Sequence, residues 1–143
     1  MHLSNRRDPM LKSKLKKKIL IVDDNSDIRK SVSLALQEQD FLEIEVTECA
    51  NATSGIEQLD KVNPDIVILD IHMPGKSGFD FIDYINNNHL TKIKVIMLSA
   101  DDSLMNILKA GAKGVDEFLF LGKPFNISDL QALVLGLCFP TNS

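Results

Sequence analysis

Residues 19–24 read Ile-Leu-Ile-Val-Asp-Asp, a short apolar run that ends abruptly at two acidic residues. Residues 66–70 have the same arrangement, Ile-Val-Ile-Leu-Asp. Continuous runs of branched apolar residues with polar residues at their ends are typical of strands that are buried on both faces. The two segments therefore predict two buried strands, each of which ends at a carboxylate.

Strand and helix patterns alternate along the rest of the chain. Further strands are expected at residues 44–49, 94–98 and about 118–121. Apolar residues at helical spacing predict a helix capped by Asn25 or Ser26, a helix at 54–62, a helix at about 79–87 with Phe79, Ile82 and Ile85 on one face, and helices at about 102–113 and 128–137. Five strand–helix units joined by short connections favour an α/β fold: a doubly wound, five-stranded parallel sheet flanked by five helices.

Length and composition fit a single globular domain. The chain has 143 residues, of which 44% are hydrophobic and 25% are charged. No apolar run reaches the roughly 18 residues that a membrane span requires. No apolar segment follows the basic residues at the N-terminus, so a secretory signal is not expected. We therefore expect a cytoplasmic protein with no membrane span, in which Cys49 and Cys138 are buried free thiols.

Charge divides the chain into a basic N-terminal arm and an acidic body. Residues 1–18 contain seven Lys or Arg and one acid, and the remaining residues carry a net charge of −10. We assign residues 1–17 to the arm, 18–139 to the domain and 140–143 to a tail. The arm is either a solvated leader or a segment that binds an anionic partner or membrane surface. Without interleaved aromatic residues it is weak support for nucleic-acid binding, and no direct DNA binding is expected.

Chemically useful side chains follow four of the five expected strands: Asp23 and Asp24, Asp70, Ser99, and Lys123. Open parallel sheets bind ligands beyond the carboxyl ends of their strands. Three carboxylates at one edge repel each other unless a cation lies among them, and a set of hard oxygen ligands favours Mg²⁺.

The other two side chains suit a phosphoryl group. An ammonium at Lys123 and a hydroxyl at Ser99 can stabilise the negative charge that phosphoryl oxygens gather during transfer. A carboxylate at the centre, Asp70, can act as the nucleophile and form an acyl phosphate. Taken singly, each of these residues has an ordinary alternative role as a helix cap or a turn residue. Their placement at the ends of four strands favours the chemical interpretation.

Four motifs together resemble the receiver domain of two-component response regulators: residues 19–25 (ILIVDDN), 70–75 (DIHMPG), 98–100 (LSA) and 123–125 (KPF). The resemblance extends over residues 18 to about 139. It implies a flavodoxin-like fold with strand order 2-1-3-4-5. It also implies a phosphorylation-activated signalling switch of a two-component system, either a stand-alone regulator or a phosphorelay intermediate. Such a switch is no metabolic enzyme but promotes its own Mg²⁺-dependent aspartyl phosphorylation and dephosphorylation.

The resemblance implies roles for the acidic residues and for His72. Asp70 matches the phosphoacceptor, and Asp24 matches the acidic residue that binds Mg²⁺ directly. Asp23 matches its partner, which often acts through water. The backbone carbonyl of His72 matches the remaining protein ligand. We expect the His72 side chain to line the mouth of the site, although such a residue could also be taken for a metal ligand or a phosphohistidine.

The resemblance also implies a switch mechanism. Ser99 matches the hydroxyl that turns toward the phosphoryl group, and Lys123 matches the lysine that pairs with that group. An aromatic residue on the fifth strand usually moves with the hydroxyl. Counting back from Lys123 identifies it as Phe120, whereas counting forward from Ser99 identifies it as Phe118. The disagreement predicts a short insertion within residues 118–122.

The resemblance implies a histidine kinase or a histidine phosphotransfer protein as the phosphodonor. The output is expected to be a downstream protein target that reads the surface of helix four, strand five and helix five. No DNA-binding or catalytic domain is expected after residue 139, so signalling by protein contact follows, from a monomer or a weak phosphorylation-dependent dimer. Two alternatives stand beside this expectation: an excised receiver of a larger regulator, and a degenerate receiver that acts only as a protein-binding module.

Two other functions fit the same fold class less well. A flavin or dinucleotide carrier needs a Gly- or Ser/Thr-rich phosphate loop after the first strand, where this chain has Asp23 and Asp24. A metal-dependent phosphatase with an aspartate nucleophile would usually place that residue after the first strand and would need a substrate-capping insert. The chain is too short to contain such an insert.

Overall fold

The structure is a computed structural model, which describes residues 15–73, 75, 78–90, 92–101 and 118–139. Its strands are β1 (Leu15–Val22), β2 (Leu42–Cys49), β3 (Ile66–Asp70), β4 (Lys94–Ser99) and β5 (Phe118–Gly122). Its helices are α3 (Ser26–Gln37), α4 (Ala52–Val62), α5 (Gly78–Asn87) and α7 (Ile127–Cys138). The helix expected at about residues 102–113 lies outside the described residues.

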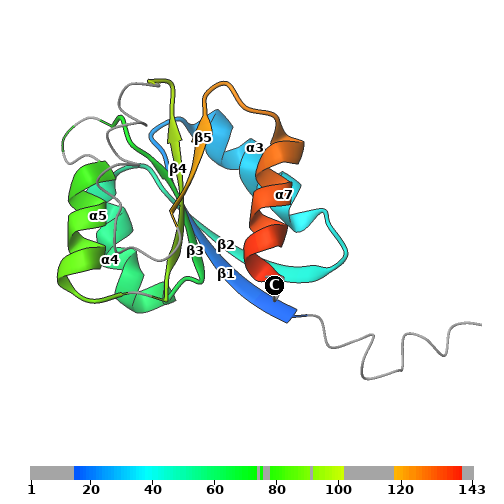
Figure 1. The fold of residues 1–143 in the computed structure, drawn as a ribbon, viewed down its shortest axis with the longest axis horizontal. Helices are drawn as coiled ribbons and strands as arrows, with labels where there is room; N and C mark the ends of the chain where they lie inside the picture. The colour runs from blue at the N-terminus through cyan, green and yellow to red at the C-terminus, as the bar shows by residue number, and fades with distance from the viewer. Residues whose placement is uncertain (1–14, 74, 76–77, 91, 102–117, 140–143) are drawn as a thin grey trace, which may run out of the picture.

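All five strands form one parallel sheet in the order β2-β1-β3-β4-β5. Helices α4 and α5 cover one face of this sheet, and α3 and α7 cover the other (Figure 1). The prediction of a doubly wound parallel sheet with this strand order is confirmed. Among the described helices, none is long and apolar enough to cross a membrane.

Two hydrophobic cores lie on opposite faces of the sheet. Successive residues of β1 alternate between them: Leu20 and Val22 pack beneath α4 and α5, and Ile19 and Ile21 pack beneath α3 and α7. This alternation explains why the apolar run of β1 is continuous, since both faces of the strand are covered. The two cysteines are buried and free as expected, and they belong to different cores.

Strand β1 starts earlier than its apolar run. Residues Leu15–Lys18 pair with Leu42–Glu45 of β2, whereas β3 joins β1 only from Ile19 onward. Part of the predicted basic arm therefore belongs to the sheet. The strand tolerates lysines at this end because only one neighbouring strand is present there, which leaves the Lys16 side chain exposed to solvent.

Helix α5 buries only part of the expected face: Ile85 is buried and Ile82 partly buried, but Phe79 is not. Phe81 and Ile85 are buried, whereas Phe79 is 38% exposed. Gly78, the first residue of the helix, packs against the backbone of Ile71: a Cβ at Gly78 would lie 2.9 Å from the Ile71 Cα atom. This close approach sets the rotation of the helix, so that residues three and seven positions later face the sheet.

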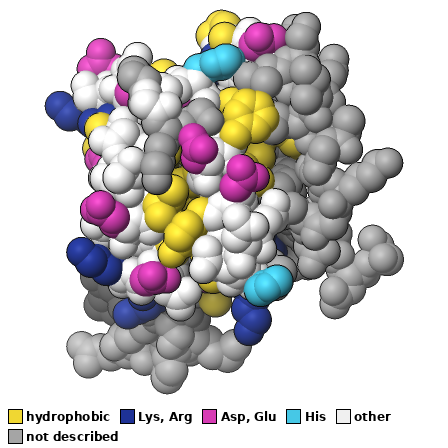
Figure 2. Space-filling model, turned by 90° about the vertical axis from the view of Figure 1, so that its left-hand side faces the viewer, with side chains coloured by type: hydrophobic (Ala, Val, Ile, Leu, Met, Phe, Trp, Pro, Cys, Tyr) yellow, Lys and Arg dark blue, Asp and Glu magenta, His cyan; other side chains and the backbone are white. Residues whose placement is uncertain are grey.

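The outer surface of α4 and α5 is acidic. Figure 2 shows this face, where Asp and Glu side chains border a strip of hydrophobic side chains. Exposed acids on the two helices are Glu57, Asp60, Asp80 and Asp83. The negative charge that the sequence assigns to the body is thus displayed on this face.

Candidate functional site

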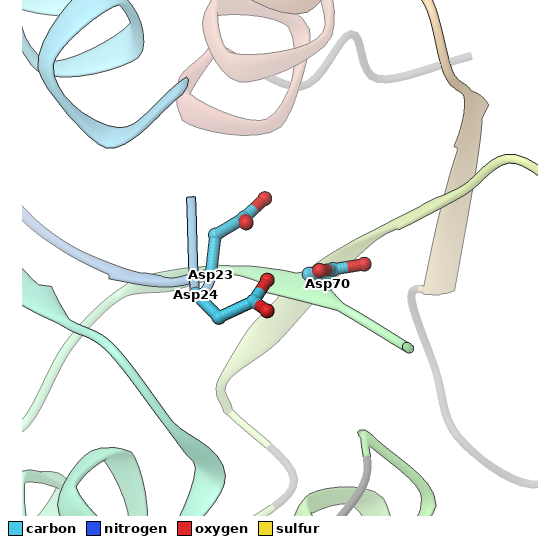
Figure 3. A group of neighbouring side chains, drawn as sticks. All are labelled: Asp23, Asp24 and Asp70. Atoms are coloured by element: carbon cyan, nitrogen blue, oxygen red, sulfur yellow. The ribbon is translucent and has the colours of Figure 1, made fainter. Parts of the chain in front are cut away.

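The chemically useful residues converge at the carboxyl edge of the sheet. Asp23 follows β1, Asp70 ends β3, Ser99 ends β4, and Lys123 follows β5. Strands β1, β3, β4 and β5 are consecutive neighbours, so residues far apart in sequence come together there. Figure 3 shows the three aspartates at this edge, where β1 and β3 end.

Asp23, Asp24 and Asp70 form a compact carboxylate cluster. One carboxylate oxygen from each residue lies within 4.8 Å of the other two. The side chains of Asp23 and Asp70 are buried, with relative exposures of 0% and 4%, whereas Asp24 is exposed. Hard anionic oxygens at this spacing suit a small divalent cation. The open side at Asp24 would leave room for the water and phosphate ligands that Mg²⁺ usually keeps.

Lys123 supplies positive charge to the two buried carboxylates. Its Nζ atom lies 3.0 Å from Asp23 Oδ2 and 3.5 Å from Asp70 Oδ2. The Lys123 side chain is only 19% exposed, so these ion pairs are partly shielded from water. The structure thus places Lys123 between the acidic residues that follow β1 and β3, 100 positions from Asp23 in the sequence.

The turn after β1 is held by main-chain hydrogen bonds. The Asp23 N–H donates to the carbonyl of Cys49 at the end of β2, and Asp23 Oδ1 accepts from the Asn25 N–H at 2.9 Å. Asn25, and not Ser26, is the N-cap of α3: its Oδ1 accepts from the N–H groups of Asp27 and Ile28. Helix α3 therefore begins three residues after Asp23 and fixes the path of the chain past the site.

Asp70 is a weaker acid than an ordinary aspartate. Burial, and secondly the nearby carboxylate of Asp23, raise the pKa of Asp70 from 3.8 to about 6, although Lys123 and the His72 N–H lower it. The His72 N–H donates to Asp70 Oδ1 at 3.2 Å, and the His72 side chain is exposed. At neutral pH Asp70 is still mainly ionised, as a nucleophile must be.

This raised pKa predicts a pH-dependent difference between the wild-type chain and Asp70→Asn, both kept free of metal. Between about pH 4 and pH 6 the native state holds a proton on Asp70 that the unfolded chain has released. The contribution of Asp70 to the free energy of unfolding therefore falls as the pH rises through this window. Above about pH 6, the ionised Asp70 carboxylate lowers the free energy of unfolding by at most about 3 kcal/mol.

Urea unfolding in EDTA at several pH values measures this effect. Asp70→Asn is expected to gain stability relative to wild type as the pH rises from 4 to 7. A difference in unfolding free energy that stays constant over this range would contradict the raised pKa.

The Ser99 hydroxyl is buried and engaged locally. Its Oγ accepts a hydrogen bond from the Asp101 N–H at 3.0 Å, and the Ser99 carbonyl accepts from the Lys123 N–H at 2.8 Å. The first bond caps the turn after β4, and the second ties the end of β5 to the end of β4. Ser99 therefore links the turn after β4 to Lys123, the residue that follows β5.

The pairing of β4 with β5 corrects the predicted insertion. Residues Val95–Ser99 pair one to one with Phe118–Gly122, so the ladder contains no extra residue. Phe120 pairs with Met97 and packs against the core beneath α4 and α5. The side chain of Phe118 lies outside the described part of the chain.

A further side chain contacts the site, although the sequence did not indicate it. Arg29, in the first turn of α3, donates from Nη1 to the main-chain carbonyl of Asp23 at 2.6 Å. Its Nε lies 3.3 Å from Glu48 Oε1 near the end of β2. In the sequence, an arginine in the first turn of a helix cannot be distinguished from a solvent-exposed charged residue. Its position in the helical pattern therefore did not indicate these contacts.

Comparisons with known proteins identify the family of this chain. Residues 19–135 match the family model described as the response regulator receiver domain. The transcriptional regulatory protein BtsR of Escherichia coli K12 is 40% identical over 114 residues, which are 80% of this chain and 45% of BtsR. The phosphate regulon transcriptional regulatory protein PhoB of the same organism is 30% identical over 119 residues, 82% of this chain and 50% of PhoB. The chain thus spans about half the length of these relatives.

Solved structures show the same similarity. The receiver domain of the Francisella response regulator 1452 superposes with a TM-score of 0.72 at 26% identity, covering 85% of this chain and 95% of that one. The chemotaxis protein CheY4 of Vibrio cholerae superposes with a TM-score of 0.69 at 28% identity, covering 87% of this chain and 99% of that one.

Proposed function

The chain belongs to the response regulator receiver family, and from this premise we propose that it is a signalling switch that accepts a phosphoryl group on Asp70. Members of this family serve phosphorylation-dependent signalling and are not metabolic enzymes. The observation that carries the proposal is the cluster of Asp23, Asp24 and Asp70 with Lys123 ion-paired to its two buried members.

The proposed donor is a phosphohistidine on a histidine kinase or a histidine phosphotransfer protein. An Asp70 carboxylate oxygen forms a bond to phosphorus while the bond between phosphorus and the donor imidazole nitrogen breaks, with its electron pair passing to that nitrogen. The product is an acyl phosphate on Asp70. Attack of water on the same phosphorus breaks its bond to the Asp70 oxygen, releases inorganic phosphate and returns the carboxylate. We propose that the chain promotes this dephosphorylation as well.

Receiver domains use Mg²⁺ at an acidic pocket, and the residues here fit that ion. Asp23, Asp24, Asp70 and the His72 carbonyl would hold it. When bound, Mg²⁺ supplies charge stabilisation for the phosphoryl oxygens. Lys123, which follows β5, contributes a positive charge and offsets the repulsion between Asp23 and Asp70.

A phosphoryl group on Asp70 carries roughly −1.5 to −2 charges at neutral pH, in place of the single charge of the free carboxylate. We propose that the Ser99 hydroxyl then leaves the Asp101 N–H and donates to a phosphoryl oxygen, and that Phe120 moves into the space it vacates. Such a change shifts a two-state equilibrium. A downstream protein target would read it on the surface that includes β5 and α7. This applies equally if the chain is part of a longer regulator.

Replacing Ser99 or Phe120 by alanine is expected to weaken this response without preventing phosphorylation. Ser99→Ala removes the donor that senses the phosphoryl group, and Phe120→Ala removes the proposed moving ring. In both variants, NMR shifts induced by phosphorylation should persist around Asp70 but shrink along β5 and α7. Phe118→Ala serves as the comparison, since Phe118 is the other candidate. If neither Ser99→Ala nor Phe120→Ala alters the β5 and α7 shifts, the conformational change is not transmitted through these two residues.

Treatment of the chain with acetyl phosphate and Mg²⁺ tests the proposed function itself. A small donor needs no docking surface, so phosphorylation then depends only on the site. We expect a hydroxylamine-sensitive acyl phosphate that requires Mg²⁺. A chain that stays unmodified under these conditions would instead be a degenerate receiver that acts by binding partners.

A further inference from the structure

Arg29 connects the turn that carries two of the acidic residues to the end of strand β2. Its Nη1 donates to the Asp23 carbonyl at 2.6 Å, and its Nε pairs with Glu48 Oε1 at 3.3 Å. The Arg29 side chain is 16% exposed, and that of Glu48 is 36% exposed. The guanidinium is a rigid planar fork, so two partners on different nitrogen atoms define its orientation.

The accepting carbonyl belongs to the peptide that joins Asp23 to Asp24. A peptide unit is planar, so a hydrogen bond that holds the Asp23 carbonyl also orients the Asp24 N–H and Cα. The Asp23 side chain has further partners, the Lys123 ammonium and the Asn25 N–H. Asp24 is exposed, so its carboxylate depends on the backbone for its direction.

We propose that Arg29 is a positioning residue for the cation site: it orients the Asp23–Asp24 peptide so that the Asp24 carboxylate faces Asp70. Glu48 orients the guanidinium in turn. The inference rests on the proposed role of Asp24 as an Mg²⁺ ligand, and it assigns to Arg29 no contact with the cation or the phosphoryl group.

The sign of the expected effect separates positioning from simple electrostatics. Arg29 carries a positive charge beside a site for a positive ion. If charge alone mattered, removing it would tighten Mg²⁺ binding. If Arg29 positions Asp24, removing it weakens Mg²⁺ binding although the net charge becomes more favourable. Outer-shell partners of metal ligands typically contribute 10- to 100-fold in affinity.

Isothermal titration of the chain with Mg²⁺ provides the test, at a temperature where thermal unfolding shows each variant to be folded. Arg29→Gln is expected to raise the dissociation constant roughly tenfold. Arg29→Lys keeps the charge but loses the fork, so it should also weaken binding. Lys30→Gln removes the same charge from the neighbouring, exposed position and should leave the dissociation constant unchanged or slightly lower.

A double-mutant cycle identifies the group through which Arg29 acts. In an Asp24→Ala background, Arg29→Gln should change the Mg²⁺ dissociation constant by less than about twofold, since the positioned group is gone. Wild-type or tighter Mg²⁺ binding by Arg29→Gln, or full rescue by Arg29→Lys, would overturn the positioning role and leave the metal site standing. Unchanged Mg²⁺ binding in Asp24→Ala alone would overturn the proposed metal site, and the inference with it.

Discussion

Asp70→Asn is expected to abolish Mg²⁺-dependent phosphorylation of the chain by acetyl phosphate while preserving the fold. An amide oxygen is a poor nucleophile and cannot form an acyl phosphate. The side chain keeps its size, and its oxygen can still accept the hydrogen bond from the His72 N–H. Loss of the charge also removes the cost of burying a carboxylate and the repulsion from Asp23, the two effects that raise the pKa of Asp70. The variant should therefore fold at least as well as wild type.

Intact-mass spectrometry before and after hydroxylamine measures this effect. Asp60→Asn is the matched control, because Asp60 is an exposed acid on α4 and should label as wild type does. Labelling that persists in Asp70→Asn would mean that the phosphoacceptor is another residue. Peptide mapping would then distinguish Asp23 from Asp24.

Asp24→Ala is expected to lower Mg²⁺ affinity by at least about tenfold and to slow phosphorylation accordingly. Asp24 is the exposed member of the carboxylate cluster, so its removal should cost the fold little. Mg²⁺ binds the native state and should raise the melting temperature of the wild-type chain. This stabilisation should nearly disappear in Asp24→Ala at the same Mg²⁺ concentration.

Asp27→Ala provides the control for loss of charge alone. Asp27 is an exposed acid in the first turn of α3, outside the carboxylate cluster. An equal loss of affinity in both variants would mean that Mg²⁺ responds to general negative charge and not to ligation by Asp24. In metal-free buffer we expect Asp70→Asn to gain more stability than Asp24→Ala, because the raised pKa belongs to the buried carboxylate.

The strands and the composition of the site could be predicted from local patterns. A parallel strand covered on both faces must be apolar at every position, so the run from Ile19 to Val22 is recognisable without a structure. An acid directly after such a run lies where the carboxyl ends of the strands meet, whatever the details of packing. Asp23 and Asp70 follow from this rule, and the structure places them together there.

Other features depended on how the elements pack. Periodicity suggested that Phe79 faces the core, but the approach of Gly78 to Ile71 rotates α5 and buries Phe81 instead. Residue counting suggested extra residues beside Phe120, but the pairing of β5 with β4 excludes them from the strand. In both cases an inter-element contact decided between alternatives that were locally equivalent.

The sequence by itself determined the fold class and the carboxylates at the strand ends, because burial on two faces constrains every residue of a strand. Only the tertiary structure decided that Lys123 lies 3.0 Å from Asp23 and that Arg29 reaches from α3 to the Asp23 carbonyl and Glu48. It also decided that burial raises the pKa of Asp70 to about 6. These properties arise from strand order and from distances between segments far apart in the chain, which no local pattern encodes.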